Sequence, residues 1–389
     1  MPATVRISPR GEDRVRSGHP WIYRSDVRDV EDGASAGAVV RVLGAKERPL
    51  GHALFSDQSQ IVLRMVSRGE AAVDAVFWRA RLEAALAFRA SLGLDATAYR
   101  LVHGEADLLP SLIVDRYDDV LVLQALSRGM DRLVPTLVPM LVELTGARGI
   151  LARNDPKVRL LEGLEQKVEV LHGEVPATVV VREGPVSYDV DPWHGQKTGL
   201  FLDQRENRVA AAQYARGRVL DCFSYNGSFA LRLASVADDV EALDSSADAV
   251  QRIAQNAAKN GLSNVRAREA NVFDELRRLE RENARFDTIV LDPPAFAKNK
   301  ASVPKALAGY KEINLRALHL LRPGGYLVTC SCSYNVDEAT FGQVLYEASV
   351  DSHTPVAVVE KRMQGRDHPV LLGVPETYYL KCFVLRKLA

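Results

Sequence analysis

The chain has 389 residues, of which 47% are hydrophobic and 26% charged, and its 50 basic side chains are balanced by 50 acidic ones. This length suffices for two or three domains with full cores. Zero net charge gives no global electrostatic footprint for nucleic acid, so any basic contact surface must be local. The sequence lacks a signal-peptide core and any stretch approaching the ~18 apolar residues of a membrane span, which predicts a cytoplasmic protein. Its four cysteines predict neither a disulfide framework nor a metal site.

Two segments carry a local basic excess. Residues 1–28 hold six arginines against three acidic side chains, and residues 296–323 hold six lysines and arginines against Glu312. Taken singly, either excess is explained equally well by a solvated face. The second gains weight because it lies between two segments with chemically suggestive residues, described below.

The first 70 residues read as a small β-rich module without a long helical period. Strands are expected at 5–7, 38–43, 49–55 and 61–65. The stretch from Gly18 to Tyr23 sets Trp21 and Tyr23 beside arginines, a combination suited to stacking on unpaired bases and contacting phosphates. A Trp21 that simply anchors a small core is at least as good an interpretation from composition.

The central portion predicts an α+β arrangement. Helices are expected at 75–92 and 132–144, a hairpin at 109–114 and 120–125, and a strand at 149–153. His103, Glu105 and Asp107 cluster in this portion, but their spacing matches no metal-site pattern, so a structural role is favoured.

After a hairpin at 179–181 and 188–190 and a helix at 206–214, strand and helix alternate regularly. Strands are expected at 219–220, 240–243, 265–267, 288–291, 326–329 and 378–385, and helices at 227–234, 247–260, 273–282, 305–321 and 337–349. This alternation predicts a mostly parallel, doubly wound sheet.

Polar residues follow the first three of these strands. Asp221 precedes a helix that begins at Gly227, without the G-x-G-x-x-G fingerprint of dinucleotide dehydrogenases. Asp244 stands about twenty residues later, where ribose hydroxyls are accepted. Asn271 offers an amide for an adenine amino group. Each residue alone is often just a helix cap, but in sequence the three favour S-adenosylmethionine over NAD.

The fourth and fifth strands lead into the reactive candidates. Asp292-Pro293-Pro294 forms a rigid turn that holds Asp292 at the carboxyl edge of the sheet. The segment from Cys330 to Ser333 is polar, with no apolar face to bury, and a thiol just past a strand end is well placed for chemistry. Two small buried sulfurs in a tight turn would have the same sequence.

These motifs together resemble the class I methyltransferases, and specifically the bacterial family of 23S ribosomal RNA 5-methylcytosine methyltransferases with an N-terminal PUA domain. The resemblance covers the whole chain and rests on residues 18–21, 104–107 with 114–117, 197–205, 221–227, 292–296 and 331–333. It implies a PUA-like RNA-binding domain over 1–72, a central α+β domain over 73–183 and a Rossmann-like methyltransferase domain over 184–389. It also implies S-adenosyl-L-methionine as cofactor, ribosomal RNA as partner and a homodimer.

The resemblance assigns roles residue by residue. Cys332 would be the nucleophile that adds to cytosine carbon 6, and Asp292 would bind the cytosine amino group and ring nitrogen 3. Cys222, Cys330 and Cys382 are expected to be structural. The expected cofactor contacts are Phe201, Gln204, Arg205, Asp221, Phe223, Tyr225, Asn226, Gly227, Ser228, Asp244, Ser245, Asn271, Val272 and Asp292.

Two departures keep alternatives open. Ala295 stands where broader relatives have a second cysteine that assists product release, so the group that removes the carbon 5 proton is not identified. Asn271 stands where many methyltransferases have Asp. Members of the same sequence family methylate guanine, so one alternative is methylation of a guanine or an exocyclic amine without covalent catalysis. The other is a non-catalytic RNA-binding or ribosome-assembly protein.

Overall fold

The computed structural model describes residues 2–297 and 299–388. The chain forms two compact units. The N-terminal unit contains the residues up to Gly184 together with Val190–Leu202 and Arg366–Thr377, and the C-terminal unit contains Pro185–Asp189, Asp203–Gly365 and the residues from Tyr378 onward. The division into three domains at 72/73 and 183/184 stays a prediction.

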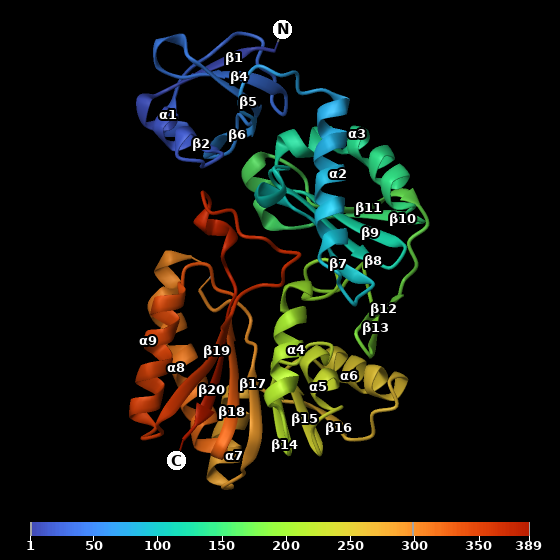
Figure 1. Ribbon diagram of the computed structural model, residues 1–389, viewed down its shortest axis with the longest axis vertical. Coiled ribbons are helices and arrows are strands. Elements are labelled where there is room, and N and C mark those ends of the chain that lie inside the picture. The colour runs from blue at the N-terminus through green and yellow to red at the C-terminus, as the bar shows by residue number, and fades with distance from the viewer. Residues whose placement is uncertain (1, 298, 389) are drawn as a thin grey trace. The chain divides into compact units, whose positions relative to one another are not determined.

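The first sheet of the N-terminal unit is six-stranded within the described residues, in the order β2-β6-β5-β4-β1-β3 (Figure 1). Only β1 and β4 are parallel neighbours there. The strands are β1 (Thr4–Ile7), β2 (Trp21–Tyr23), β3 (Val27–Val30), β4 (Val39–Leu43), β5 (Pro49–Phe55) and β6 (Ile61–Ser67). The predicted strands are therefore present, and β2 and β3 are additional.

An additional short helix, α1 (Pro9–Arg16), was not predicted. Its sequence is mostly charged, so it has little apolar periodicity to detect. Local signals specify it instead, because the Ser8 side chain accepts a hydrogen bond from the Gly11 N–H and Pro9 occupies the first turn.

The second sheet has the order β11-β10-β9-β8-β7 and packs with two helices around a shared apolar core. Its strands are β7 (Ala98–His103), β8 (Leu112–Tyr117), β9 (Val120–Ala125), β10 (Gly149–Asn154) and β11 (Lys167–Gly173), and the helices are α2 (Ala75–Ser91) and α3 (Arg128–Thr145). The predicted helices and hairpin are confirmed, with one shift. β8 runs through Tyr117, so Asp115 is a buried strand residue rather than part of the turn.

The remaining short elements are one pair of strands and several 3₁₀ turns. β12 (Val179–Glu183) and β13 (Val186–Val190) follow the second sheet, and the boundary between the units falls at the turn between them. The 3₁₀ turns are η1 (Arg24–Asp26), η2 (Ala45–Glu47), η3 (Gly104–Asp107), η4 (Lys157–Glu162), η5 (Leu202–Gln204), η6 (Lys300–Ser302) and η7 (Pro375–Thr377).

The C-terminal unit is built on a sheet of seven strands within the described residues, in the order β16-β15-β14-β17-β18-β20-β19 (Figure 1). The first five are parallel, and β20 is antiparallel to both of its neighbours. The strands are β14 (Arg218–Cys222), β15 (Asp239–Asp244), β16 (Val265–Glu269), β17 (Phe286–Leu291), β18 (Leu321–Ser331), β19 (Val356–Arg362) and β20 (Lys381–Lys387). The predicted doubly wound sheet is confirmed.

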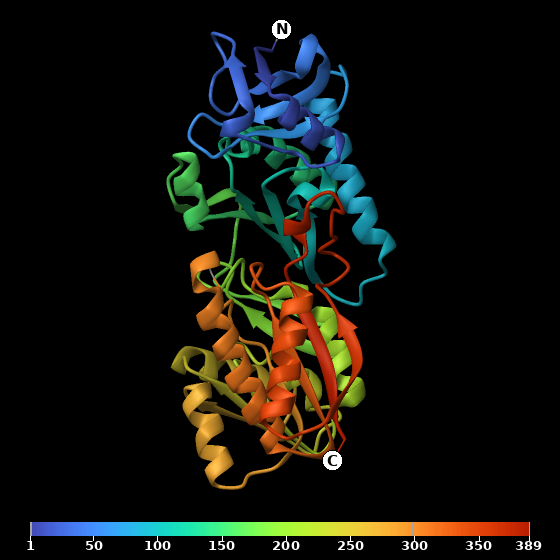
Figure 2. The same cartoon turned by 90° about the vertical axis from the view of Figure 1, so that its left-hand side faces the viewer.

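Helices cover both faces of this sheet, as the view turned by 90° also shows (Figure 2). Alternate residues of each central strand enter different cores. Leu220 and Cys222 pack with α7, α8 and α9, whereas Val219 packs with α4, α5 and α6. The helices are α4 (Arg205–Tyr214), α5 (Ser228–Leu233), α6 (Ala247–Lys259), α7 (Val272–Arg281), α8 (Val303–Leu320) and α9 (Glu338–Asp351).

The expectation that the Cys330–Ser333 segment has nothing to bury is wrong. β18 continues to Ser331, and Cys330, Ser331 and Ser333 are fully buried. The reason is β20, which lies along this end of β18 and pairs Cys330 with Cys382 and Ser331 with Lys381. The pairing with β20 thus buries a polar segment whose own sequence does not indicate burial.

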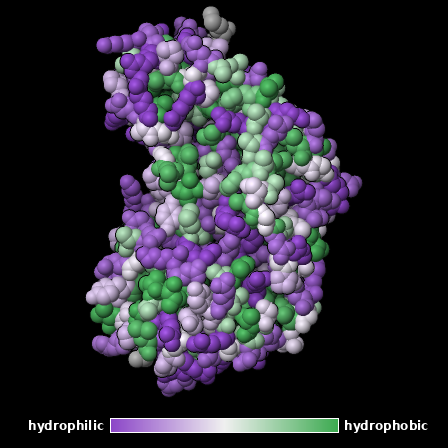
Figure 3. All heavy atoms as spheres, viewed as in Figure 1, coloured by the Kyte–Doolittle hydropathy of each residue, from purple (hydrophilic) through white to green (hydrophobic). Residues whose placement is uncertain are grey.

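None of the helices in the described part of the chain is long and apolar enough to cross a lipid bilayer. On the face shown in Figure 3, hydrophilic residues are interspersed with several separate apolar patches.

Candidate active site

The site lies at the carboxyl edge of the C-terminal sheet. β15 and β16 extend from one side of β14, and β17 and β18 from the other, so the chain order reverses between β14 and β17. Ligands of open α/β sheets bind in the crevice at such a reversal. The Asp292 N–H lies 3.4 Å from the Cys222 carbonyl oxygen, which brings the loops after β14 and β17 side by side.

Asp221 is the next-to-last residue of β14 and is only 1% exposed. Its Oδ2 accepts hydrogen bonds from Ser224 Oγ at 2.5 Å and from the Ala230 N–H at 3.0 Å. Its Oδ1 has no hydrogen-bond partner among the described residues. Burial raises the pKa of this carboxyl to about 7, against the lowering effect of those two hydrogen bonds. A buried carboxylate oxygen without a donor suits a positively charged or hydroxylated ligand.

The loop after Asp221 is held in an unusual backbone conformation. Phe223 and Tyr225 have φ values of 63° and 54°, and Gly227 has 85°. Left-handed backbone costs a non-glycine residue roughly 1–2 kcal/mol and is concentrated at ligand sites. Asn226 within this loop is buried, and its Nδ2 is without a partner in the part of the chain that the structure describes. Its Oδ1 accepts from Ser228 Oγ at 2.6 Å.

Asp244 ties the second loop to the first. Its Oδ2 accepts from the Tyr225 N–H at 2.8 Å, and its Oδ1 accepts from the Ser246 N–H at 3.0 Å. The neighbouring Ser245 is exposed. The carboxylate therefore lies at the sheet edge, where one oxygen bonds to the loop after β14 and the other to the loop after β15.

Asn271 is the N-cap of α7. Its Oδ1 accepts from the Phe273 N–H at 3.0 Å and from the Asp274 N–H at 3.4 Å, while Val272 behind it is buried. The helix-cap interpretation of this residue is thus observed. The amide oxygen considered for adenine recognition already accepts two backbone hydrogen bonds.

A chain of amides leads to Asp292. Gln204 Nε2 donates to Asp292 Oδ1 at 2.7 Å, and Gln204 Oε1 accepts from Asn207 Nδ2 at 2.6 Å. Arg362 Nε in turn donates to Asn207 Oδ1 at 3.0 Å. These hydrogen bonds fix the orientation of the Gln204 amide. Because its oxygen accepts from Asn207, the NH₂ group of Gln204 is directed to Asp292. The adjacent Arg205 is buried and pairs with Glu206 at 3.1 Å.

The loops after β17 and β18 are joined by Ser333. Its Oγ accepts from the Ala297 N–H at 3.1 Å and hydrogen-bonds to the Tyr310 hydroxyl at 2.9 Å. The ring of Tyr310 packs on Phe296, with the centroids 4.7 Å apart. Cys332 Sγ lies 3.8 Å from the Pro293 carbonyl oxygen. The thiol of Cys332 and the Asp292-Pro293-Pro294 turn therefore belong to one constellation.

The four cysteines differ in environment. Cys222, Cys330 and Cys382 are buried, and Cys332 is partly exposed. Burial raises the pKa of the Cys222 thiol well above its usual value, and a hydrogen bond with Cys382 together with burial does the same for Cys330. Raised thiol pKa values disfavour the thiolate, which is the nucleophilic form.

Lys381 was not predicted and lies at the same edge. Because β20 is antiparallel to β18, its first residue meets the carboxyl end of β18. The side chain is 1% exposed, and Nζ donates to the Ser333 carbonyl at 2.7 Å and to the Tyr379 carbonyl at 2.9 Å. A lysine opening the apolar run Cys382–Leu385 was the available sequence signal.

Phe201 belongs to the N-terminal unit, where its ring lies 4.6 Å from Lys197 Nζ. In that unit the motif at residues 197–205 contacts the motif at residues 114–117. Thr198 Oγ1 donates to Asp115 Oδ2 at 2.6 Å and bonds to the Tyr117 hydroxyl at 2.9 Å.

Three of the six basic residues in the second basic segment form ion pairs. Lys311 lies 2.8 Å from Asp351, Arg316 lies 2.5 Å from Glu280, and Arg322 lies 2.7 Å from Asp287. Lys298 lies outside the described residues. The charge excess counted along the sequence therefore overstates the basic surface available there.

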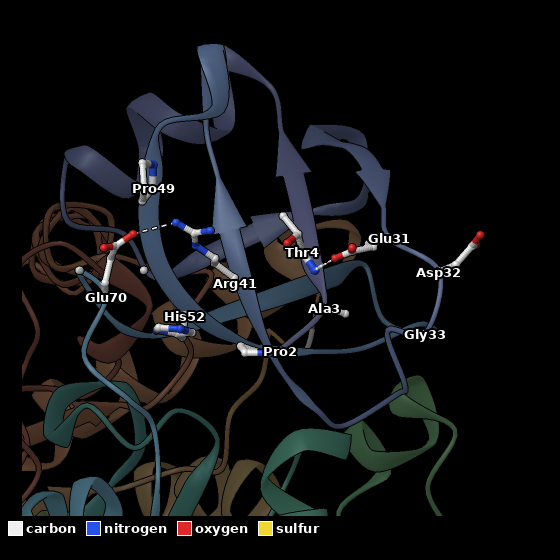
Figure 4. A pocket seen from close by; sticks show the side chains of 12 residues that line it. Pro2, Ala3, Thr4, Glu31, Asp32, Gly33, Arg41, Pro49, His52 and Glu70 are labelled. Atoms are coloured by element: carbon white, nitrogen blue, oxygen red, sulfur yellow. Dashed lines mark hydrogen bonds and ion pairs between the residues drawn. The ribbon is translucent and has the colours of Figure 1, made fainter.

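Trp21 and Tyr23 of the N-terminal module are partly exposed rather than core residues. Trp21 Nε1 donates to Glu105 Oε1 at 3.0 Å, and the Arg14 guanidinium stacks 4.6 Å from the Tyr23 ring. The core position of β2 is taken by Ile22. An open hollow on this module, lined by Arg41 and His52, also carries Glu31, Asp32 and Glu70 (Figure 4). Since Arg41 pairs with Glu70 at 2.7 Å, the hollow does not suit phosphate groups.

No group of three or more His, Cys, Asp or Glu residues that could hold a metal ion occurs in the range 2–297 or 299–388. Asp107 instead accepts from Arg89 at 2.5 Å, which gives it a structural contact.

The doubly wound sheet, with acidic residues at the carboxyl ends of β14 and β15, is the architecture of a Rossmann-like methyltransferase. Residues 5–68 match the model of a PUA-like domain, and residues 100–377 match that of an S-adenosylmethionine-dependent methyltransferase. The chain belongs to the S-adenosylmethionine-dependent methyltransferase family and carries an N-terminal PUA-like domain.

Similar proteins match along their whole length. The chain is 41% identical to "Ribosomal RNA large subunit methyltransferase I" of Shewanella denitrificans over 99% of this chain and 100% of the relative. It is 40% identical to the protein of the same name from Shewanella frigidimarina, with the same coverage of 99% and 100%. The crystal structure of SMU.776 complexed with SAH shares the fold at 20% identity, with a TM-score of 0.85 over 98% of this chain and 99% of that one.

S-adenosyl-L-methionine is accordingly the cofactor. The residues at the sheet edge fit it, because the buried Asp221 Oδ1 and Asn226 Nδ2 are an acceptor and a donor that the described residues leave unpartnered. They suit the charged amino-acid portion of the cofactor.

Proposed function

We propose that this protein methylates carbon 5 of a cytosine in 23S ribosomal RNA through a covalent adduct with Cys332. The family membership and the names of the two Shewanella relatives support an action on large-subunit ribosomal RNA. The observation that carries the cytosine mechanism is the Cys332 thiol. It is partly exposed and lies 3.8 Å from the carbonyl of Pro293, whereas the other three thiols are buried.

The reaction needs a thiolate because carbon 5 of a pyrimidine is a weak nucleophile. Cys332 Sγ forms a bond to carbon 6, and the displaced electron pair makes carbon 5 enamine-like. When bound, S-adenosyl-L-methionine would supply the methyl group as an electrophilic sulfonium, with the methyl–sulfur bond breaking as the new bond to carbon 5 forms. A base then removes the proton from carbon 5, and the electron pair of that C–H bond expels the Cys332 thiolate. The target base has to be unpaired or flipped out of a duplex to reach the thiol.

Asp292 is assigned to the cytosine ring. Its carboxylate accepts from the amino group and holds a proton at ring nitrogen 3, which stabilises the charge that develops as the adduct forms. Gln204 supports this role, because its hydrogen bond to Oδ1 restricts how the carboxylate can turn. The Pro293-Pro294 turn restricts the backbone on the other side.

The cofactor contacts are assigned to the loops after β14, β15 and β16 and to the segment before α4. Asp221 and Asn226 are assigned to the amino-acid portion, and Asp244 to the ribose hydroxyls. Gly227 lets the backbone approach closely. The other assigned contacts are Phe201, Gln204, Arg205, Phe223, Tyr225, Ser228, Ser245, Asn271, Val272 and Asp292.

The PUA-like domain is assigned to RNA binding, with Trp21 and Tyr23 beside arginines as its contact residues. The three domains proposed are residues 1–72, 73–183 and 184–389. We further propose that the enzyme is cytoplasmic and forms a homodimer.

Trapping on RNA that contains 5-fluorocytosine tests the mechanism. Fluorine at carbon 5 cannot leave as a cation, so methyl transfer leaves the Cys332–carbon 6 bond intact and a stable protein–RNA adduct results. We expect the adduct with the wild-type chain and with Cys330→Ala, and none with Cys332→Ala. Methylation of unmodified ribosomal RNA by Cys332→Ala at the wild-type rate would overturn the covalent mechanism and favour a guanine or exocyclic amine target. Failure to bind S-adenosylmethionine in calorimetry would favour a non-catalytic RNA-binding protein.

A further inference from the structure

Lys381 is a buried cation that has no role in binding the cofactor or the cytosine in the proposed function. Its ammonium is held by the carbonyls of Ser333, at 2.7 Å, and Tyr379, at 2.9 Å. Ser333 directly follows Cys332, so the ammonium is held by the backbone of the loop that carries the thiol. Burying a cation is unfavourable unless an anion or several acceptors compensate it.

Two groups that can carry negative charge, Cys332 and Asp337, act on Lys381. Burial lowers the pKa of Lys381 to about 8, and negative charge on Cys332, and secondarily on Asp337, acts to raise it. Asp337 is the N-cap of α9, where its Oδ1 accepts from the Thr340 N–H at 2.7 Å. The other titratable groups nearby are engaged elsewhere: Tyr310 bonds to Ser333 Oγ, and Lys361 on β19 pairs with Glu338 at 3.1 Å.

The geometry points to Lys381 as a positioning residue that stabilises the thiolate of Cys332 and so prepares it for attack on carbon 6. This inference rests on the proposed function of Cys332. The electrostatic interaction between two ionisable groups is reciprocal, so an anion on Cys332 that stabilises the ammonium is stabilised by it to the same extent. The two carbonyl acceptors keep Nζ in place, and the ammonium need not touch the substrate.

Lys381 and Cys330 face opposite sides of the sheet. Cys330 faces the core that contains Val328, Cys382 and Val384. Lys381 alternates with Cys382 along β20 and therefore faces the opposite side of the sheet. The cation is thus placed on the side away from Cys330 and Cys382.

The pH dependence of iodoacetamide alkylation tests the inference without RNA. The measurement uses the full chain, with Cys332→Ala as the blank for the buried thiols. An ordinary cysteine has a pKa of about 8.5. We expect the wild-type alkylation midpoint to lie below that value, and Lys381→Met to shift it upward by about one pH unit, the lower end of the effect of a nearby opposite charge. Lys381→Arg retains the charge and should restore most of the shift.

Lys387→Met is the matched control. Lys387 lies on the same strand and also donates from Nζ to two carbonyls, those of Leu318 at 2.8 Å and Leu321 at 2.9 Å. Its removal disturbs β20 in a similar way but leaves the Cys332 loop alone, so the alkylation midpoint should not move. A wild-type midpoint at or above about 8.5 would overturn the inference even if Lys381→Met does not fold. Equal shifts in the Lys381→Met and Lys387→Met variants would also overturn it.

The two proposals fail separately. If the alkylation midpoint shifts as expected but no adduct forms on 5-fluorocytosine RNA, the thiolate pairing stands and the cytosine mechanism falls. If the adduct forms but the midpoint does not depend on Lys381, the mechanism stands and this inference falls.

Discussion

Gln204 and Asp292 are 88 residues apart in the sequence, yet the amide of the first donates to the carboxylate of the second at 2.7 Å. This contact joins the segment before α4 to the turn after β17. Gln204→Met removes the donor while keeping much of the volume of the side chain. We expect kcat/KM for RNA methylation to fall about tenfold, in line with the 1–3 kcal/mol that a lost buried hydrogen bond costs. Gln343→Met, which removes an exposed amide–carboxylate contact of 3.2 Å with Glu347, should leave it unchanged.

Asp221 predicts a pH dependence of stability. Burial raises its pKa from 3.8 to about 7, so between these values the folded chain binds more protons than the unfolded chain. The free energy of unfolding should therefore fall as the pH rises from about 4 to about 7 and stay low above that. Asp221→Asn should remove this decline and, at pH 8, be more stable than the wild type by up to about 4 kcal/mol. Urea unfolding at pH 5 and pH 8 without cofactor measures the difference, and equal slopes for the two chains would contradict it.

The same substitution should affect cofactor binding in the opposite direction. An amide at position 221 retains an acceptor for Ser224 and Ala230 but loses the negative charge. Calorimetry at pH 8 should show S-adenosylmethionine binding weakened at least about tenfold, the loss expected for one charged hydrogen bond. Unchanged affinity would remove Asp221 from the cofactor site.

Gly227→Ala tests the close approach in the first loop. At a φ of 85°, a new Cβ would lie 3.1 Å from Ile253 Cγ2. Gly261 is the matched control, because it has a φ of 67° but nothing within 4 Å of a new Cβ. We expect Gly261→Ala to cost about 1 kcal/mol of stability for the backbone conformation alone, and Gly227→Ala to cost more and to weaken cofactor binding. Similar losses for both would mean that space at Gly227 is unimportant.

Ser333→Ala tests the coupling between the loops of Asp292 and Cys332. The substitution deprives the Ala297 N–H and the Tyr310 hydroxyl of their shared partner, which should lower stability by about 1–3 kcal/mol. It should also slow adduct formation on 5-fluorocytosine RNA. Tyr310→Phe removes only one of the two bonds and should have the smaller effect on both measurements.

The sequence predicted the parallel sheet well because its strands are buried on both faces. Runs such as Ile289-Val290-Leu291 are apolar throughout and are bounded by turn residues, so they are visible without knowledge of their partners. β19 was missed for the opposite reason. It is an edge strand in which no residue is buried and Val358, Val359 and Lys361 are exposed, so its sequence specifies no buried face.

Within the candidate site, residues after strand ends were predictable because parallel strands end at one edge. Asp221, Asp244 and Asp292 were found in this way. Gln204 was found only through the resemblance, since its role depends on a contact with a distant turn. Local pattern marked Lys381 only as a lysine at the start of an apolar run, because its place beside the Cys332 loop arises from the antiparallel register of β20 against β18. The burial of Ser331 and Ser333 depends on the same nonlocal pairing.

The position of β20 also sets an order of assembly during synthesis. β20 lies between β18 and β19 in the sheet, although it follows both in the chain. While the polypeptide leaves the ribosome, β18 and β19 have no shared neighbour until residues 381–387 have emerged. The nascent chain therefore carries an open gap in its sheet, and the thiol loop lacks its covering strand and its buried cation. The loop that carries Cys332 therefore gains its covering strand and the Lys381 side chain only when residues 381–387 have paired with β18.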